Sequence, residues 1–337
     1  MSLFANKGVH CVVDGQFGST GKGALCAWLA ERAMESGWNF RGAIYSGGPN
    51  SGHTFYYDGE KHVLKQLPTF AVATTLMGGE CAAYISAGAV IDPDILFAEA
   101  RRYPDVKIYV HPNAAIIDEY AREVEKWSNA DGIASTMSGT GGALMRKIAR
   151  YPSAIWKNGL WQAEIVPPNV TTMTHSLRPN TYPYLMEVSQ GFSLGINSEF
   201  YPYTTSRECT VMQGLADARI PARDLARTYM AIRTYPIRVG GDSGGWYPDQ
   251  REITWGQLGV EPELTTVTKR IRRVATFSWD QFTDACNANA PDFVFINFLN
   301  YLETKEEQDE FIKEIQYHGV DVIAGYGPTS GEIILIH

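Results

Sequence analysis

The chain has 337 residues, of which 45% are hydrophobic and 12% aromatic, so it can bury a large core, and we expect a single domain spanning residues 1–337. Its net charge of −8 argues against a broad nucleic-acid groove, so a phosphate ligand has to be held by a local group of cations. The sequence shows no secretory signal and no run of roughly 18 apolar residues, which predicts a cytoplasmic protein with no membrane partner.

The cysteines are scattered along the chain without a short repeated spacing. Such a pattern favours neither a disulfide framework nor a zinc site. We therefore expect buried thiols at Cys11, Cys26, Cys81, Cys209 and Cys286.

Predicted strands and helices alternate, and no internal repeat or linker divides the chain. In chain order we expect a strand over residues 9–13, a helix over 22–35, strands over 43–46 and 82–86, helices over 93–102 and 117–127, a strand over 293–298, a helix over 305–318, and strands over 320–324 and 333–336. Asp92 and Pro93 suit the cap and first position of one helix, and Gly319 suits the end of another. This order predicts an α/β fold with a mostly parallel central sheet flanked by helices.

The middle of the chain, residues 129–184, is rich in loops and proline. We interpret it as an insertion that forms a lid or a contact between subunits. The same stretch carries Arg146, Lys147 and Arg150 close to Ser135 and Thr136, a concentration of positive charge on an acidic chain. Arg150 is either a plain surface arginine or a residue that binds an anion.

A glycine-rich segment, residues 14–23, lies between the first predicted strand and the first predicted helix. It suits a phosphate cradle, because glycines let backbone N–H groups approach an anion and Lys22 adds a positive charge at a helix N-terminus. It is not a standard P-loop, since five residues separate Gly15 from Gly21 and Gly23 follows the lysine. The alternative is a purely structural turn between a strand and a helix.

A second glycine-dense turn, residues 46–54, follows the second predicted strand and ends in Gly52-His53-Thr54. Such a turn can present a histidine to a ligand and leave a main-chain carbonyl free for a metal ion. A lone histidine is more often a satisfied polar residue, so this turn gains weight only together with the first.

Together, the two turns resemble the adenylosuccinate synthetase family, whose hallmark is Gln-Trp-Gly-Asp-Glu-Gly-Lys-Gly followed by Gly-Gly-x-Asn-x-Gly-His-Thr. Here these motifs stand as residues 16–23 and 47–54. Further similar segments follow in the family's order, at residues 135–136, 147–150, 187–191, 201–206, 268–273 and 327–328. The resemblance therefore covers nearly the whole chain.

The resemblance implies a ligase that uses L-aspartate, a 6-oxopurine nucleotide, a nucleoside triphosphate and Mg²⁺, with a homodimer as the working unit. The implied catalytic residues are Ser19, Lys22 and His53. Residues implied to bind the substrate nucleotide are Ser19, Asn50, Ser135, Thr136, Arg150 of the other subunit, Gln190, Thr205 and Arg270. Those implied for aspartate are Thr268, Arg270 and Arg272, and Ser19 and the carbonyl of Gly52 are implied for Mg²⁺.

The residues implied for the triphosphate fall in two groups. One lies in the two glycine-rich turns and the arginine loop: Gly18, Thr20, Gly21, Lys22, Gly23, Gly52, His53, Thr54 and Arg272. The other would surround the base: Asn297, Phe298, Leu299, Asn300, Gly327 and Pro328. Without the resemblance, Arg270 and Arg272 could be a solvated basic patch, and residues 296–300 a buried strand with no ligand role.

Two departures from the family pattern change the expected substrates. Ser19 stands where the family has a catalytic aspartate, and this smaller group with donor and acceptor capacity favours guanine over hypoxanthine. A dGMP-using phage branch of the family has the same Gly-Ser-Thr-Gly-Lys-Gly loop. Asn300 stands where the family has an aspartate that binds guanine, and its amide suits adenine, which favours ATP or dATP as the phosphate donor.

Three hypotheses follow: a ligase acting on dGMP, a conventional adenylosuccinate synthetase using IMP and GTP, and a non-catalytic nucleotide-binding regulator. Ser19 alone is compatible with the regulator, because a neutral hydroxyl is no ordinary general base. His53, Lys22, Arg270 and Arg272 argue against it, since a sensor needs no aspartate loop.

Overall fold

A ten-stranded sheet organises the molecule. Its strands are β1 (Gly8–Asp14), β2 (Gly42–Ser46), β5 (Ala82–Ile85), β7 (Ile108–Val110), β9 (Val170–Thr172), β10 (Pro183–Val188), β11 (Leu225–Arg233), β15 (Phe293–Asn297), β16 (Asp321–Gly325) and β17 (Ile333–Ile336). Their order is β17-β16-β15-β11-β1-β10-β2-β5-β7-β9, and only β16 and β17 are antiparallel neighbours. The computed structural model describes residues 2–128, 133, 135–151, 166–265 and 270–336.

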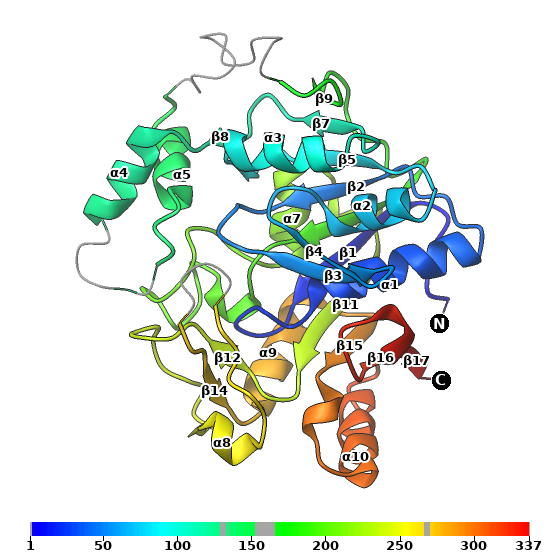
Figure 1. Cartoon of the computed structure of the whole chain (residues 1–337), viewed down its shortest axis with the longest axis vertical. Helices are drawn as coiled ribbons and strands as arrows, with labels where there is room; N and C mark the ends of the chain where they lie inside the picture. Colours follow the sequence, from blue (N-terminus) through cyan, green and yellow to red (C-terminus); the bar gives the residue numbers. More distant parts are fainter. Residues whose placement is uncertain (1, 129–132, 134, 152–165, 266–269, 337) are drawn as a thin grey trace.

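Helices cover both faces of this sheet (Figure 1). The described helices are α1 (Lys22–Glu35), α2 (Thr69–Leu76), α3 (Pro93–Arg102), α4 (Glu119–Ser128), α5 (Thr140–Ile148), α7 (Val211–Asp217), α8 (Trp255–Leu258), α9 (Trp279–Asn289) and α10 (Lys305–Gln316). Of these, α4, α5 and α8 pack in smaller separate clusters. Helices α1, α2 and α3 share one buried apolar cluster with the sheet, and α7, α9 and α10 share another. The predicted fold class, an α/β domain with a mostly parallel sheet, is confirmed.

Smaller elements are attached to this framework. They are a hairpin of β3 (His53–Tyr57) and β4 (Glu60–Leu64), a parallel pair of β6 (Val90–Ile91) and β8 (Ala115–Ile116), an antiparallel sheet of β12 (Ile237–Arg238), β13 (Glu252–Ile253) and β14 (Arg273–Ala275), and the 3-10 turns η1 (Phe192–Leu194), η2 (Ala222–Asp224), η3 (Leu299–Tyr301) and η4 (Ser330–Glu332). The hairpin carries His53, and the antiparallel sheet supports the loop that carries Arg270 and Arg272.

The core explains why β1 is apolar without alternation. Side chains of a strand point to opposite faces in turn, so Val12 packs in the cluster with α1 while Cys11 and Val13 pack in the cluster with α7 and α9. Because both faces are covered, every residue of β1 is buried. The strand ends at a charged residue, Asp14, which is also buried.

Several predicted boundaries agree with the structure, and the differences have local causes. Helices α1 and α3 have the predicted bounds, and Asp92 caps α3 by accepting a hydrogen bond from the N–H of Asp94. Strand β15 ends at Asn297, one residue earlier than predicted, because Phe298 adopts a left-handed conformation that turns the chain into η3. Helix α4 begins at Glu119 and not at residue 117.

The segment 129–184 was predicted to be a loop-rich insertion, but part of it belongs to the central sheet. Its described part contains α5, β9 and the first residues of β10, and β10 lies in the middle of the sheet between β1 and β2. Strand β10 begins at Pro183 and contains Glu187, so it lacks the uninterrupted apolar run by which β1, β2 and β15 were predicted. The central strand β11 also contains polar residues and was not predicted either. Residues 152–165 lie outside the described part of the chain.

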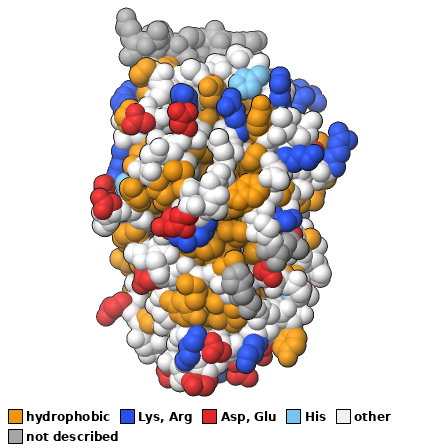
Figure 2. Space-filling view, turned by 90° about the vertical axis from the view of Figure 1, so that its right-hand side faces the viewer, with side chains coloured by type: hydrophobic (Ala, Val, Ile, Leu, Met, Phe, Trp, Pro, Cys, Tyr) orange, Lys and Arg blue, Asp and Glu red, His pale blue; other side chains and the backbone are white. Residues whose placement is uncertain are grey.

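The exterior agrees with the composition. On the face drawn in Figure 2, acidic and basic side chains both occur, with hydrophobic side chains between them, and do not form a surface of one sign. In the described part of the chain, no helix has the length and apolar character needed to cross a bilayer. All five thiols are free, and only Cys286 is partly exposed. Burial raises the pKa of the Cys209 thiol to about 12.

Candidate active site

A pocket of about 280 Å³ opens at the carboxyl ends of the central strands, where the loops after β1, β2 and β10 meet. Ligands bind at this edge in open α/β sheets. The lining residues include the predicted Gly18, Ser19, Lys22, Asn50, Gly52, His53, Ser135, Thr136, Gln190, Thr205, Arg270 and Arg272. The structure thus brings together residues that lie far apart in the sequence.

The pocket is basic although the chain is acidic. Its lining has the cationic side chains Lys22, Lys65, Arg238, Arg270 and Arg272, and within the described part of the chain Glu125 is the one acidic residue among them. The local group of cations expected for a phosphate ligand is therefore present.

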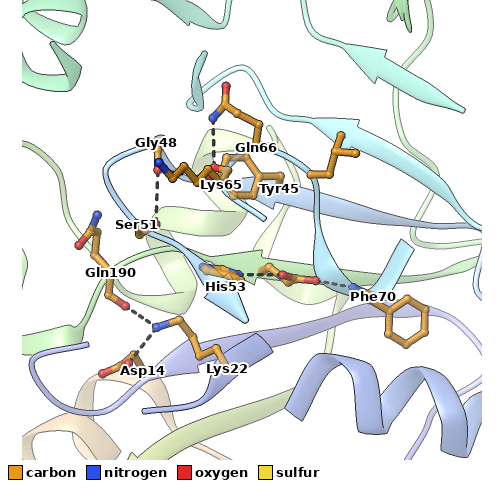
Figure 3. Close-up of polar contacts among 12 residues, drawn as sticks. Asp14, Lys22, Tyr45, Gly48, Ser51, His53, Lys65, Gln66, Phe70 and Gln190 are labelled. Atoms are coloured by element: carbon orange, nitrogen blue, oxygen red, sulfur yellow. Dashed lines mark hydrogen bonds and ion pairs between the residues drawn. The ribbon is translucent and has the colours of Figure 1, made fainter. Parts of the chain in front are cut away.

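The carboxylate of Asp14 lies within the first glycine-rich loop, and the sequence did not predict a role for it. One carboxylate oxygen accepts hydrogen bonds from the N–H groups of Gln16 and Gly18, at 2.9 and 3.1 Å. The other accepts from the Thr20 hydroxyl at 2.5 Å and from the Lys22 ammonium at 2.8 Å. The ammonium also donates to the carbonyl of Gln190 at 2.7 Å (Figure 3). A buried carboxylate thus closes the loop around Lys22.

Two glycines of this loop are required by close contacts. Gly21, which caps α1, has a left-handed φ of 92°, and a Cβ there would lie 2.0 Å from the Asn297 amide nitrogen. A Cβ on Gly23 would lie 2.5 Å from the carbonyl oxygen of Thr54, so only glycine lets α1 pack against β3. Ser19, between them and the strand, is exposed and also left-handed, with a φ of 57°.

His53 is oriented by a carboxylate that the sequence analysis also left without a role. Its Nδ1 lies 3.1 Å from Glu187 Oε2, and Glu187 Oε1 accepts the N–H of Phe70 at 2.8 Å (Figure 3). Both side chains are buried, so Nδ1 carries the proton that faces the carboxylate. The buried Nε2 has no hydrogen-bond partner in the described structure, and His53 lines the pocket. Nε2 is therefore the atom available to a ligand.

Two further polar side chains, those of Gln190 and Glu125, line the pocket. Gln190 has a left-handed φ of 73°, and its buried Nε2 has no hydrogen-bond partner in the described structure. Glu125, behind Ser135, accepts hydrogen bonds from the Ser135 hydroxyl and from the N–H of Gly139, which caps α5. Burial raises the pKa of Glu125. These contacts hold the loop of Ser135 and Thr136 against α5.

Arg270 and Arg272 reach the pocket from a loop whose described stem is held by backbone hydrogen bonds. Thr265 and Arg270 exchange two bonds through backbone and hydroxyl groups, and the N–H of Arg272 donates to the carbonyl of Glu263. Burial lowers the pKa of Arg272. Thr268 lies outside the described residues.

Arg238 is a further lining residue that the sequence analysis missed. Its buried guanidinium lies against the rings of Phe17 and Phe200, 4.3 and 5.0 Å from their centroids. It donates to the carbonyls of Gly245 and Tyr203, and burial lowers its pKa to about 10. It therefore joins three loops around the pocket.

The residues expected around the triphosphate base lie beside the pocket and do not line it. Asn297, at the end of β15, donates to the carbonyl of Thr20 at 3.2 Å and so touches the phosphate loop. Phe298 and Asn300 follow, partly and largely exposed, while Leu299 is fully buried, so its side chain is not open to a ligand. Gly327 and Pro328 follow β16, which is separated from β1 by β15 and β11.

Comparison with known proteins identifies the family. The adenylosuccinate synthetase family model matches residues 11–164 and 154–313. The chain is 38% identical over 349 residues to the N6-succino-2-amino-2'-deoxyadenylate synthase of Vibrio phage phiVC8, covering 98% of each chain. It is 27% identical to the adenylosuccinate synthetase of Pyrococcus sp. (strain ST700), covering 96% of each.

Solved structures agree with this assignment. The succinoaminodeoxyadenylate synthetase of cyanophage S-2L, bound to dGMP and dATP as an energy donor, superposes with a TM-score of 0.81 at 32% identity, covering 98% of this chain and 96% of that one. The fully ligated adenylosuccinate synthetase of Plasmodium falciparum has a TM-score of 0.78 at 17% identity, with 98% and 100% covered, and shares the fold. This chain belongs to the adenylosuccinate synthetase family, and it is a ligase of that type.

We predict that Glu187→Gln lowers the turnover number roughly 10–100-fold while the enzyme stays folded, because an amide can present its NH₂ to His53 and favour the wrong ring tautomer. Steady-state phosphate release, with circular dichroism for folding, measures this.

Glu99→Gln is the matched control for the Glu187 variant. Glu99 is also a buried carboxylate that accepts backbone N–H groups, but, unlike Glu187, it has no described hydrogen bond to His53. Its variant should lose stability and keep turnover per folded molecule. A folded Glu187→Gln enzyme with turnover within about twofold of the parent would show that Glu187 does not orient the histidine.

Proposed function

We propose that this enzyme joins L-aspartate to C6 of dGMP and consumes ATP or dATP. In the first step the γ-phosphoryl group moves to O6 of guanine, the N1 proton is lost and a nucleoside diphosphate leaves. In the second, the aspartate amine attacks C6, the C6–O6 bond breaks, and phosphate and an amine proton leave. The product is N6-succino-2-amino-2'-deoxyadenylate. Such a reaction on free nucleotides belongs in the cytoplasm, that of the host if a phage encodes the enzyme.

The observation that carries the proposal is Ser19. It lies exposed in the pocket, on the loop that also carries Lys22, where the family motif has an aspartate. A hydroxyl is smaller than a carboxylate and can both donate and accept, so it leaves room for the 2-amino group of guanine. The phage relatives named as synthases of the 2-amino product, and the S-2L structure bound to dGMP, support the same choice.

The pocket's own groups can perform both steps. The Lys22 ammonium and the loop N–H groups stabilise charge on the phosphoryl group in transfer, and His53 Nε2 donates to O6 or to the bridging oxygen in its protonated form. Gln190 binds the purine, and Asn50, Ser135, Thr136 and Thr205 bind the monophosphate. Arg270 and Arg272, together with Thr268, hold the aspartate carboxylates, and Arg270 also contacts the substrate nucleotide.

Mg²⁺ fits this donor set only if the nucleotide supplies most of its ligands. No cluster of three or more acidic, histidine or cysteine side chains that could hold a metal occurs in the part of the chain the structure describes. Mg²⁺ binds through few protein oxygens together with substrate phosphates and water. The Gly52 carbonyl and the Ser19 hydroxyl would hold it, and the ion would neutralise charge on the triphosphate oxygens.

The donor site is proposed to lie beside the end of β15. Asn297, Phe298, Leu299 and Asn300 stand where the family binds its guanine base, and no carboxylate is among them. The exposed Asn300 amide can pair with the edge of adenine. Phe298 is partly exposed and offers a ring face, with Gly327 and Pro328 at the edge of the base and Leu299 contributing through its backbone.

Two features of α4 and α5 support a homodimer whose sites are completed by Arg150. The helices pack together at one end of the molecule and leave Trp127, Ile148 and Tyr151 exposed, at 82%, 80% and 66% (Figure 1). Arg146 pairs with Asp118, and Lys147 donates to the Ala87 carbonyl, within the same chain. The Arg150 side chain is exposed, has no described hydrogen-bond or ion-pair partner, and does not line the pocket of its own chain, which supports the proposal that it serves another subunit.

We predict that dGMP supports aspartate-dependent phosphate release far better than IMP or dIMP, because the missing carboxylate leaves room for the 2-amino group. Rates of phosphate release with and without aspartate measure this preference. Ser19→Asp should shift the preference toward hypoxanthine nucleotides. Equal turnover of dGMP and IMP by the parent enzyme would favour a conventional adenylosuccinate synthetase. Binding of these nucleotides without any turnover would favour a non-catalytic regulator.

ATP or dATP should drive the reaction and GTP should be a poor donor, because no carboxylate at Asn300 accepts the two hydrogen bonds of guanine. The three donors are compared at saturating dGMP and aspartate. Asn300→Asp should improve GTP relative to ATP. If GTP is the better donor for the parent enzyme, the assignment of the base site to the end of β15 is wrong.

Sites shared between subunits can be tested by mixing two variants with impaired activity. Arg150→Ala removes a charge-assisted bond worth about 1.5–3 kcal/mol, or roughly 10–150-fold in nucleotide binding. Mixed with Lys22→Ala chains, it should form heterodimers with one doubly damaged and one intact site, so activity should exceed that of either variant alone. Lys126→Ala, which removes an exposed cation on α4, is the control and should stay active. A demonstrated heterodimer without recovered activity would refute shared sites.

A further inference from the structure

Arg233, the last residue of β11, is a fully buried arginine that the proposed mechanism does not use. A buried guanidinium is costly unless its charge and its N–H groups are satisfied. Its backbone is fixed by Gln16, which accepts its N–H and donates to its carbonyl, at 3.0 and 3.1 Å. The residue is thus held against the first glycine-rich loop, whose Gly18 and Ser19 line the pocket.

The guanidinium contacts three segments that the proposed function assigns to three different ligands. Nη1 donates to the Ser19 carbonyl at 3.2 Å, in the loop beside the guanine base. Both terminal nitrogens donate to the Glu263 carboxylate, on the stem of the aspartate loop. The plane lies 4.0 Å over the Phe298 ring, at the proposed donor base. No single substrate contact would require this arrangement.

The contact with Ser19 falls on a strained position. Ser19 has a φ of 57°, and a residue with a side chain adopts this left-handed conformation only where its surroundings impose it. The next carbonyl, that of Thr20, accepts from Asn297 at the end of the adjacent strand. The consecutive carbonyls of Ser19 and Thr20 are therefore both held by hydrogen bonds from buried side chains, and the Ser19 side chain points into the pocket.

The contact with Glu263 extends the connection to the aspartate loop. The Glu263 carbonyl accepts the N–H of Arg272, and its carboxylate also accepts from the Tyr301 hydroxyl at 3.2 Å. Since Arg272 lines the pocket, a displacement of Glu263 would displace this arginine as well.

We propose that Arg233 is a positioning residue that fixes the outward conformation of Ser19 and so sets the preference for guanine over hypoxanthine. Glu263, which contacts both Arg233 and Arg272, connects the position of Ser19 to that of the aspartate loop. The inference rests on the proposed function, since it assumes that Ser19 meets the purine base. A lysine at this position would keep the charge but could not span Ser19 and Glu263 together, because it lacks the planar fork.

The test measures the ratio of the dissociation constants of dIMP and dGMP by calorimetry, in the parent full-length enzyme and in Arg233→Lys. We expect the ratio to fall at least tenfold in the variant. Arg207→Lys is the matched control: Arg207 is also buried and paired with a carboxylate, Asp217, but its described side-chain hydrogen bonds go to Gly88, Ser46 and Asp217 and not to Ser19 or Glu263. The control should lose thermal stability and keep the parent ratio.

Glu263→Gln keeps the test decisive if Arg233→Lys does not fold, because Glu263 is partly exposed and its amide retains an acceptor for one guanidinium N–H. This variant should lower the same ratio by a smaller factor and raise the KM for aspartate. Folded variants with the parent ratio would overturn the inference and leave the proposed function intact. A parent enzyme that binds dIMP as well as dGMP would contradict the proposed function itself and, with it, the role assigned to Arg233.

Discussion

The buried pair of Asp14 and Lys22 is the interaction on which the site depends. A carboxylate at the end of a central strand would be costly if it were not satisfied, and it accepts four hydrogen bonds within a single loop. Those bonds determine the conformation of the loop, orient the Thr20 hydroxyl toward Asp14, and hold the Lys22 ammonium near the N-terminus of α1. The Lys22 ammonium also bonds to the Gln190 carbonyl, so the loops after β1 and β10 share one fixed point.

The same arrangement of charge recurs around the pocket. Asp14 stands behind Lys22, Glu187 behind His53, and Glu263 beside Arg233 and close to Arg272. Lys22 and His53 line the pocket, while the carboxylates that orient them, Asp14 and Glu187, are buried and do not line it. In the third pair the order is reversed, since Arg233 is fully buried and Glu263 is partly exposed. This layering lets an acidic protein present a basic cavity, and it orients each group before an anionic ligand arrives.

How much of the structure the sequence predicts depends on how far apart along the chain the interacting residues lie. Local signals, such as the capping pair Asp92 and Pro93, gave the bounds of α3, and the ordered motifs gave the family and most of the lining residues. Glu187 and Arg233 could not be found in this way, because His53 lies 134 residues from Glu187 and Ser19 lies 214 residues from Arg233 along the chain. Strand β10 was missed for a related reason, since a carboxylate needed by His53 interrupts its apolar run. The one local signal left unused was an acidic residue, Asp14, at the end of an apolar strand.

Within the proposed reaction, the replacement of an aspartate by Ser19 removes a base from the position beside purine N1, yet the N1 proton has to leave before or during phosphoryl transfer. A positive environment lowers the pKa of a group that becomes negative when it loses its proton. The described pocket supplies such an environment through Lys22, Arg238, Arg270 and Arg272, with Glu125 as its one acidic lining residue. Negative charge that develops on O6 and N1 is therefore stabilised where it forms, which reduces the need for a strong base. The loss of one carboxylate and the cationic lining are then two parts of a single solution: the first makes room for the 2-amino group, and the second allows the proton to pass to solvent or to a phosphate oxygen.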